Sequence, residues 1–254
     1  MHVVPLPALA DNYIWLLHDD AGQAIVVDPG EAAPVEAALA ARSLRLRAIL
    51  LTHHHGDHIA GAAALRDRHG ATVYAPHDAR IDAADQRVGN GDVVALEQPQ
   101  ARFDVLEVPG HTRSHIAYAG EGLLFCGDTL FSLGCGRLFE GTPAQMFASL
   151  QRLAALPGDL MVCCGHEYTE ANGRFARQVD PTNDALAARC AEAAEARVLG
   201  RPTVPVSLAS ELACNPFLRT DSPSVADWAR RQHAADDHVE RFAALRAAKD
   251  AFRG

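Results

Sequence analysis

Short apolar runs rich in β-branched residues recur along the first two-thirds of the chain, and each ends in a loop of glycine, proline, histidine or aspartate. Runs of this length that are bounded by turn residues are typical of buried strands. Two further runs, ATVYAP and DVVALEQ, flank a turn at residues 89–92 and also predict strands. The five runs that end in loops cover residues 24–30, 47–58, 103–112, 122–129 and 160–167.

Helical patterns lie between some of these strands. Residues 34–43 are alanine-rich and amphipathic, and the pattern over residues 59–69 stops at a glycine, which commonly ends helices. Thr142 and Gln145 form a capping box with a proline between them, which predicts a helix start. One side of that helix carries Met146, Phe147, Leu150 and Leu153. Up to about residue 168 the chain is therefore of the α/β class, with helices covering sheets.

The pattern changes near residue 170, because no convincing strand follows. Helical periodicity covers residues 184–199, 223–231 and 237–252, and the second of these begins at a Ser-Pro pair, a common helix start. We therefore predict a catalytic domain over residues 1–168 and a small all-α domain over residues 169–254.

The composition is that of an ordinary globular protein, with 48% hydrophobic and 22% charged residues over 254 positions. A net charge of −9 argues against broad contact with nucleic acid or anionic membranes. We find no signal peptide and no apolar run near the roughly 20 residues that span a bilayer. The six cysteines lack C-x-x-C spacing and are expected to be reduced, mostly buried thiols. We expect a cytoplasmic protein and a monomer.

Four histidines and an aspartate lie within the seven residues THHHGDH, which follow the strand-like run ILL and precede a helix. In α/β proteins, functional groups gather beyond the carboxyl ends of strands. His53 and His55 are two residues apart in a tight loop and can converge, while Asp57 and His58 can point to a neighbouring position. The side chain of His54 should diverge from theirs and take a supporting or packing role.

Three more candidate ligands occupy the same structural position, directly after a glycine at the end of a strand. They are His111, Asp128 and His166. Imidazole and carboxylate groups bind zinc, iron or manganese well, and two cations need more ligands than one loop supplies. A solvated polar loop would explain THHHGDH alone, but not the recurrence at three further strand ends. Asp28 and His115 can orient ligand histidines, although a turn-initiating role explains Asp28 equally well.

The pattern H-x-H-x-D-H followed by isolated His, Asp and His resembles the metallo-β-lactamase superfamily. Within it, the chain is similar to the glyoxalase II (hydroxyacylglutathione hydrolase) family. The matching segments are DNYIWLL, THHHGDH, PGHT, FCGDTLF, GCGR-x-x-EGT, GHEYT, NPFLR and LRAAKDAF, which run from Asp11 to Phe252. The resemblance implies an αββα sandwich with a small C-terminal all-α domain.

The same resemblance implies a site for two divalent metal ions, foremost zinc, with iron or manganese as alternatives. One ion takes His53, His55 and His111, the other takes Asp57, His58 and His166, and Asp128 bridges them. The implied reaction is attack of a metal-bridged hydroxide on S-(2-hydroxyacyl)glutathione, typically S-D-lactoylglutathione, in the second step of methylglyoxal detoxification. It yields glutathione and D-lactate, with Asp57 and Asp128 as catalytic residues.

A substrate that carries the two carboxylates of glutathione needs a local basic pocket in a chain of net charge −9. Arg246 and Lys249 lie three residues apart, hence on one face of the last predicted helix. The resemblance implies that they bind the glutathione portion together with Arg137 and Tyr168. Because a thiol can leave as thiolate, a thioester suits a two-metal site without an evident general acid.

The chain departs from the family pattern in two places. Leu138 and Phe139 follow GCGR where the family often has an aromatic residue and then a tyrosine, so any contact from that hydroxyl is lost. Ser114 stands in GHTRSH where glycine is common. The ligand His111 is intact beside it.

Other functions share this ligand pattern. A β-lactamase is expected to act outside the cytoplasm, and a tRNA-processing nuclease needs a large basic surface. A sulfur dioxygenase typically holds one iron and lacks the helix with Arg246 and Lys249. A non-catalytic binding protein predicts a broken ligand set, whereas this set is complete. Hydrolysis of a glutathione thioester is therefore the predicted function.

Overall fold

The computed structural model describes residues 1–253, and these residues form two compact units. Unit 1 consists of Met1–Glu107 and Ser114–Gly127, and unit 2 of Val108–Arg113 and Asp128–Gly254. This division follows compactness alone. The domain boundary at residues 168/169 stays a prediction.

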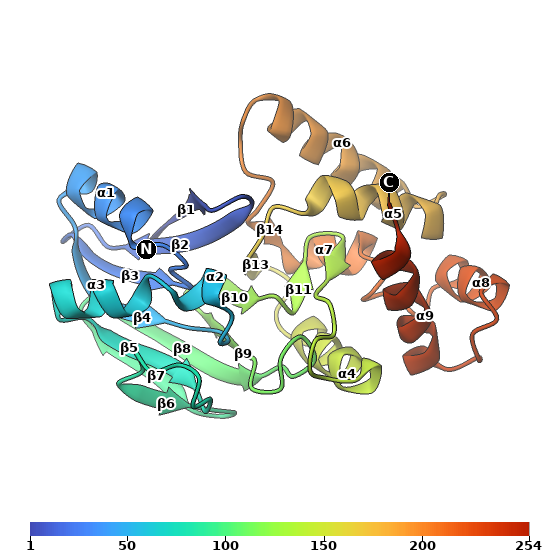
Figure 1. Ribbon diagram of the computed structural model, residues 1–254. Coiled ribbons are helices and arrows are strands. Elements are labelled where there is room, and N and C mark those ends of the chain that lie inside the picture. The colour runs from blue at the N-terminus through green and yellow to red at the C-terminus, as the bar shows by residue number, and fades with distance from the viewer. Residues whose placement is uncertain (254) are drawn as a thin grey trace. The chain divides into compact units, whose positions relative to one another are not determined.

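Unit 1 is built on a six-stranded sheet with the strand order β1-β2-β3-β4-β5-β6 (Figure 1). Strands β1 to β3 are antiparallel, and β3 to β6 run parallel. Parallel strands need cover on both faces, which explains their near-continuous apolar runs. The strands are β1 (His2–Ala8), β2 (Asn12–His18), β3 (Gln23–Val27), β4 (Arg45–Leu50), β5 (Thr72–Pro76) and β6 (Gln86–Val88).

Helices α1 (Ala32–Arg42) and α3 (Ala62–His69) cover one face of this sheet (Figure 1). Val35 of α1 and Leu65 of α3 pack in one core cluster with Ile49 of β4, and all three side chains are fully buried. Burying apolar side chains of this kind contributes roughly 1.5–3 kcal/mol each. The helix predicted over residues 34–43 is confirmed, with its start two residues earlier.

The helix predicted over residues 59–69 is confirmed from Ala62 to its end before Gly70, but its start is wrong, because the chain turns at Gly61. A short helix, α2 (Gly56–Ile59), ends first, and α3 begins at Ala62. The N–H group of Gly61 donates a hydrogen bond to Pro29 O at 2.8 Å, and a Cβ there would lie 2.7 Å from the same oxygen. This close approach requires glycine and turns the chain between the two helices.

Four antiparallel strands of unit 1 form a second layer: β7 (Val93–Glu97), β8 (Gln100–Glu107), β9 (Ile116–Gly120) and β10 (Leu123–Gly127). Tyr118 of β9 connects this layer to the first sheet. Its hydroxyl donates to the backbone oxygens of Leu51 and Tyr74 at 3.1 and 3.4 Å. Complete burial raises the pKa of Tyr118 well above its ordinary value, so the phenol stays a donor.

Unit 2 is mostly helical, with two short strand pairs. Strand β11 (Leu130–Phe131) pairs with β12 (Gly134–Cys135), and β13 (Met161–Cys164) pairs with β14 (Val206–Ser207). Strand β14 corrects the expectation that no strand follows residue 170. The prolines at 202 and 205 hold this segment extended, although it pairs over only two residues.

The helices of unit 2 are α4 (Pro143–Ala154), α5 (Thr169–Val179), α6 (Asp184–Val198), α7 (Leu208–Cys214), α8 (Pro223–Arg231) and α9 (His238–Ala251). The predicted capping box is present, because Thr142 and Gln145 exchange side-chain to backbone hydrogen bonds. Ser222 and Asp237 cap α8 and α9. Helices α5 and α7 were not predicted from the sequence.

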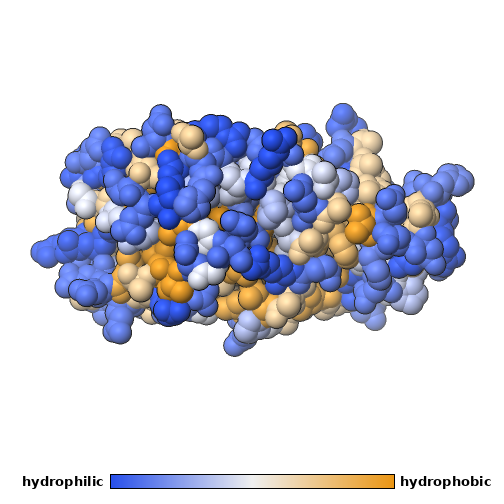
Figure 2. All heavy atoms as spheres, turned by 90° about the horizontal axis from the view of Figure 1, so that it is seen from below, coloured by the Kyte–Doolittle hydropathy of each residue, from blue (hydrophilic) through white to orange (hydrophobic). Residues whose placement is uncertain are grey.

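Hydrophilic side chains cover much of the face shown in Figure 2, with apolar side chains gathered in patches between them. Within residues 1–253, none of the helices has the length and apolar character that a bilayer crossing requires. The six cysteines form no disulfide in the structure, and five of them are buried, which confirms the expectation of mostly buried side chains.

Replacing Tyr118 by phenylalanine should lower the free energy of unfolding by about 1 kcal/mol, since it removes one buried donor and leaves two backbone acceptors. Urea unfolding followed by circular dichroism measures the change. Tyr74→Phe is the matched control, because Tyr74 takes part in this contact through its backbone oxygen only. Equal losses in the two variants would contradict the assigned role.

Candidate metal centre and substrate pocket

The THHHGDH loop of unit 1 arranges its candidate ligands as two neighbouring pairs. His53 Nε2 lies 3.1 Å from His55 Nδ1, and His58 Nε2 lies 3.4 Å from Asp57 Oδ2. The loop follows β4, and α2 carries Asp57 and His58. Each pair thus presents two donor atoms at one point, as two ligands of one cation must.

Asp28, at the end of β3, orients these rings from behind. Its carboxylate accepts hydrogen bonds from Thr52 N–H at 2.8 Å and from Thr52 Oγ1 at 2.6 Å, and it lies 3.0 Å from His58 Nδ1. Thr52 Oγ1 in turn lies 3.0 Å from His53 Nδ1. With Nδ1 engaged in both rings, Nε2 is the atom that each ring can offer to a metal.

Asp28 itself lies close enough to His53 and His58 to complete a three-residue metal-binding group, and all three are buried. Its two oxygens already accept the hydrogen bonds of Thr52 and face His58 Nδ1. Orientation of the ligands therefore accounts for Asp28 better than ligation. Asn12 has a similar task, because its Nδ2 donates to Asp57 Oδ2 at 2.9 Å.

Unit 2 brings the other three candidate ligands together around one carboxylate oxygen. Asp128 Oδ2 lies 3.3 Å from His111 Nε2 and 3.3 Å from His166 Nε2. His111 Nδ1 lies 2.9 Å from Arg137 O, so its Nε2 again points to the site. All three residues are buried.

These donors fit divalent metal ions. Imidazole nitrogens and carboxylate oxygens are the ligands that zinc, iron and manganese accept, and one oxygen midway between two imidazoles suits a bridging ligand. The structure groups the seven predicted ligands as four in unit 1 and three in unit 2. The four are His53, His55, Asp57 and His58, and the three are His111, Asp128 and His166.

The two glycines of the GCGR motif lie in close packing, Gly136 against Asp128 and Gly134 against Asn172. A Cβ on Gly136 would lie 1.8 Å from Asp128 O and 3.3 Å from His111 Nδ1. A Cβ on Gly134 would lie 2.5 Å from Asn172 Nδ2. At position 136 only glycine fits, because the clash would be with backbone, whereas a side chain at position 134 would displace that of Asn172.

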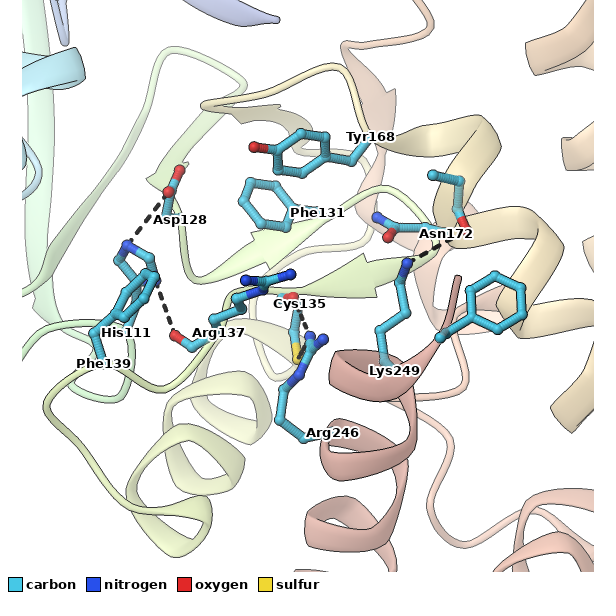
Figure 3. A pocket seen from close by; sticks show the side chains of 12 residues that line it. His111, Asp128, Phe131, Cys135, Arg137, Phe139, Tyr168, Asn172, Arg246 and Lys249 are labelled. Carbon is cyan, nitrogen blue, oxygen red and sulfur yellow. Dashed lines mark hydrogen bonds and ion pairs between the residues drawn. The ribbon is translucent and has the colours of Figure 1, made fainter. Parts of the chain in front are cut away.

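A pocket of about 430 Å³ opens beside this part of unit 2. That volume lies within the range of small-molecule sites. Figure 3 shows His111 and Asp128 on one side of it, and Lys249 with Asn172 on the other. Its lining consists of His111, Asp128, Phe131, Cys135, Arg137, Phe139, Tyr168, Ala171, Asn172, Arg246, Lys249 and Phe252.

All four residues predicted to bind substrate line this pocket. Arg246 and Lys249 come from one face of α9, as the spacing predicts. Arg137 follows the GCG segment, and the ring of Tyr168 stacks on that of the candidate ligand His166, with centroids 4.8 Å apart.

Arg246 is only 5% exposed and is held on two sides. Its Nη1 donates to Cys135 O at 2.7 Å (Figure 3). Its Nη2 donates to Asp250 Oδ1 at 2.9 Å. Its guanidinium also lies over the ring of Phe217, 5.4 Å from the centroid. The charge is therefore fixed in position at the pocket wall.

Lys249 donates to Ala171 O at 3.4 Å, and its ammonium lies 5.4 Å from the ring centroid of Phe252. Burial lowers the pKa of Lys249, and the positive charges of Arg246, Arg174 and Arg137 lower it further. An excess of positive charge in a net acidic chain makes this end of the pocket suited to an anion.

The sequence analysis missed several pocket residues. Asn172 lies on α5, a helix that was not predicted because its sequence is largely polar, and it donates to Ser132 O at 3.1 Å. Phe139 was noted only for lacking a hydroxyl. It is 63% exposed and packs edge-on against His111, with ring centroids 5.2 Å apart.

Two family models together match almost the whole chain. Residues 10–166 match the metallo-beta-lactamase superfamily, and residues 167–252 match the C-terminus of hydroxyacylglutathione hydrolase. A hydroxyacylglutathione hydrolase of Xanthomonas campestris pv. campestris is 55% identical over 100% of both chains. Another, from Xylella fastidiosa, is 54% identical over 99% of this chain and 98% of its own.

Solved structures are similar as well. ETHE1 from Myxococcus xanthus has a TM-score of 0.65 at 31% identity, covering 85% of this chain and 84% of its own. TTHA1623, solved in a di-iron-bound form, has a TM-score of 0.54 at 31% identity and covers 65% of this chain and 92% of its own.

Fold and site together define a protein of the metallo-β-lactamase superfamily, which confirms the predicted αββα class. Within that superfamily, the chain belongs to the hydroxyacylglutathione hydrolase family.

Replacing Gly136 by alanine should displace the segment that carries Asp128, since the added Cβ has no room. A misplacement of about 1 Å can cost roughly 100-fold in kcat/KM, and we expect a loss of that order together with reduced metal content. Metal analysis and thioester hydrolysis measure the two effects. Gly56→Ala is the control, because nothing lies within 4 Å of a Cβ there. Normal metal content in Gly136→Ala would contradict the packing argument.

Proposed function

We propose that the chain hydrolyses S-(2-hydroxyacyl)glutathione, typically S-D-lactoylglutathione, to glutathione and a 2-hydroxy acid. One observation carries the proposal: a single pocket has candidate metal ligands on one side and a cluster of cations on the other. The thioester would lie beside His111 and Asp128. The carboxylates of the glutathione portion would lie toward Lys249.

The cation cluster supports glutathione thioesters over plain acyl thioesters. Arg137, Arg246 and Lys249 line the pocket, and they are joined there by Tyr168. We assign the binding of the glutathione portion to these four residues. A charge that is already held in position loses little freedom when it binds an anion, which favours affinity.

We assign two divalent ions, most commonly zinc, with iron or manganese as alternatives, to the seven ligands. His53, His55 and His111 would hold one ion, Asp57, His58 and His166 the other, and Asp128 both. When bound, such ions supply a hydroxide at neutral pH and stabilise negative charge on a carbonyl oxygen. The placement of Asp128 Oδ2 between two imidazoles supports the bridging role.

The protein's own groups have distinct tasks in this reaction. Asp57, which Asn12 holds by a hydrogen bond of 2.9 Å, and Asp128 would orient the attacking water. Tyr168 stacks on His166 and fixes that ring. Water adds to the thioester carbon, and the bond to sulfur breaks with departure of the thiolate. Because a thiolate is a stable leaving group, no strong acid is needed behind it.

The change of family model between residues 166 and 167 supports the proposed division of labour. Residues 1–168 would carry the metal chemistry, and residues 169–254 would supply the helices that bind the substrate. Helix α9 with Arg246 and Lys249 belongs to the second part.

The purified protein should contain two metal ions per chain and hydrolyse S-D-lactoylglutathione. It should act much more weakly on a plain acyl thioester without the glutathione carboxylates, and not on a β-lactam. Metal analysis and the three assays test this together. A chain with both metal sites filled that leaves the glutathione thioester intact would refute the proposed function.

Replacing Lys249 by methionine should raise KM for S-D-lactoylglutathione about tenfold or more, with a modest loss of kcat. A hydrogen bond to a charged group contributes about 1.5–3 kcal/mol, and 1.4 kcal/mol is a factor of ten. Arg253→Met is the matched control, because it removes a nearby positive charge that is exposed and does not line the pocket. An unchanged KM in Lys249→Met would remove Lys249 from the site.

The lowered pKa of Lys249 gives the same test a pH dependence. As pH rises through that pKa, the ammonium loses its charge, so KM should rise at a lower pH than an ordinary lysine would allow. Lys249→Arg should not show this rise, because an arginine stays charged.

Lys249 is also the only lysine in the chain, so amine-directed labelling reports on this residue and the N-terminus alone. An S-alkylglutathione that occupies the pocket should suppress the labelling of Lys249.

A further inference from the structure

A buried carboxylate behind the metal-ligand loop has no part in the proposed reaction. Asp78 follows strand β5 of unit 1 and is 7% exposed. It accepts hydrogen bonds from Arg80 Nε at 2.8 Å and Arg80 Nη2 at 2.6 Å. Arg87 Nη1 donates to Asp78 O at 2.6 Å and holds the backbone at the same point. Its position is therefore fixed from both sides.

Two further contacts lead from Asp78 towards the metal loop. Ser114 Oγ donates to Asp78 Oδ2 at 2.5 Å, and the same oxygen lies 3.5 Å from His54 Nδ1. The hydrogen bond from Arg80 is the largest cause that holds the pKa of Asp78 well below its usual range, and the bond from Ser114 adds to it. Asp78 therefore presents a negative charge to the ring of His54 at neutral pH.

His54 lies between the two candidate ligands of one cation in the sequence, and its ring lies beside theirs. Its ring packs edge-on against that of His55, with centroids 4.8 Å apart, and against that of His53, at 6.5 Å. The ring of His115 stacks on that of His53, with centroids 4.6 Å apart and an interplanar angle of 16°. His115 thus contacts the ring of His53 directly. Its neighbour Ser114 reaches the ring of His54 through the carboxylate of Asp78.

We propose that Asp78 and Ser114 are positioning residues for the metal-ligand pair His53 and His55, acting through the ring of His54. We call these three residues, Asp78, Ser114 and His54, the Asp78 brace. A fixed His54 ring limits the directions that the rings of His53 and His55 can take. The inference rests on the proposed metal site, and it gives Ser114, where the family pattern often has glycine, a task of its own.

Replacing Asp78 by asparagine should weaken zinc binding roughly tenfold, the lower end of what loss of a ligand-supporting group costs. Ser114→Ala should weaken it less, because Arg80 still holds the carboxylate, and Ser114→Thr should restore wild-type affinity through its hydroxyl. Competition with a chromogenic chelator measures the affinity. The absorption spectrum of the cobalt(II)-loaded protein should change in Asp78→Asn and Ser114→Ala but not in Ser114→Thr.

Asp85→Asn is the matched control. Asp85 accepts a hydrogen bond from Val73 N–H at 2.9 Å, so it stabilises the same strand β5. It should lower thermal stability and leave the zinc affinity and the cobalt spectrum unchanged. If Asp78→Asn behaves like Asp85→Asn, losing stability but not affinity, the brace is refuted.

A double-mutant cycle tests whether Asp78 acts through His54. His54→Phe keeps a ring but removes the nitrogen that faces Asp78, so adding Asp78→Asn to it should have little further effect on zinc affinity. Additive losses would show that Asp78 acts elsewhere and would overturn the inference. A wild-type protein that binds zinc but cleaves no glutathione thioester would refute the proposed function alone, since these arms measure metal binding.

Discussion

The carboxylate of Asp28 is the constraint on which the ligand geometry of unit 1 depends. An imidazole ring can bind a metal through either nitrogen, and the partner of the other nitrogen decides which one is used. Asp28 engages His58 directly and His53 through the hydroxyl of Thr52. A buried carboxylate is costly unless donors surround it, and the N–H and Oγ1 groups of Thr52 meet that need at 2.8 and 2.6 Å. The group that orients the ligands is thus itself held by the loop that carries them.

In unit 2, a backbone oxygen orients the ring of the candidate ligand His111. The Nδ1 atom of His111 lies 2.9 Å from the backbone oxygen of Arg137. That oxygen is in place because the GCGR segment packs against Asp128 so closely that Gly136 admits no side chain. The candidate ligand His111, the glycine motif and the pocket residue Arg137 are therefore parts of one packing arrangement. A change in the motif would affect metal binding and substrate binding together.

The secondary-structure elements that were predicted correctly from the sequence are those determined by residues close together in the chain. Apolar runs, the capping box at Thr142 and the starts of α8 and α9 follow from neighbouring residues, and the structure confirms them. Contacts between distant segments could not be predicted. The break at Gly61 comes from the carbonyl of Pro29, and Asn172 reaches the pocket on a helix whose polar sequence resembles a loop. The candidate ligands follow from the strand ends, whereas their assignment to two ions came from family resemblance; both their role as ligands and that assignment remain proposals.

Arg246 and Lys249 of α9 differ in how far their N–H donors are already engaged within the protein. Both terminal nitrogens of Arg246 donate within the protein, to Cys135 O and to Asp250 Oδ1. An ammonium has three donors, and Lys249 directs one of them to Ala171 O at the long distance of 3.4 Å. Lys249 is therefore better placed to donate directly to a substrate carboxylate, while Arg246 shapes the wall and adds its charge. Partial burial strengthens that attraction, because charges interact more strongly where water is excluded, and the same burial lowers the pKa of Lys249.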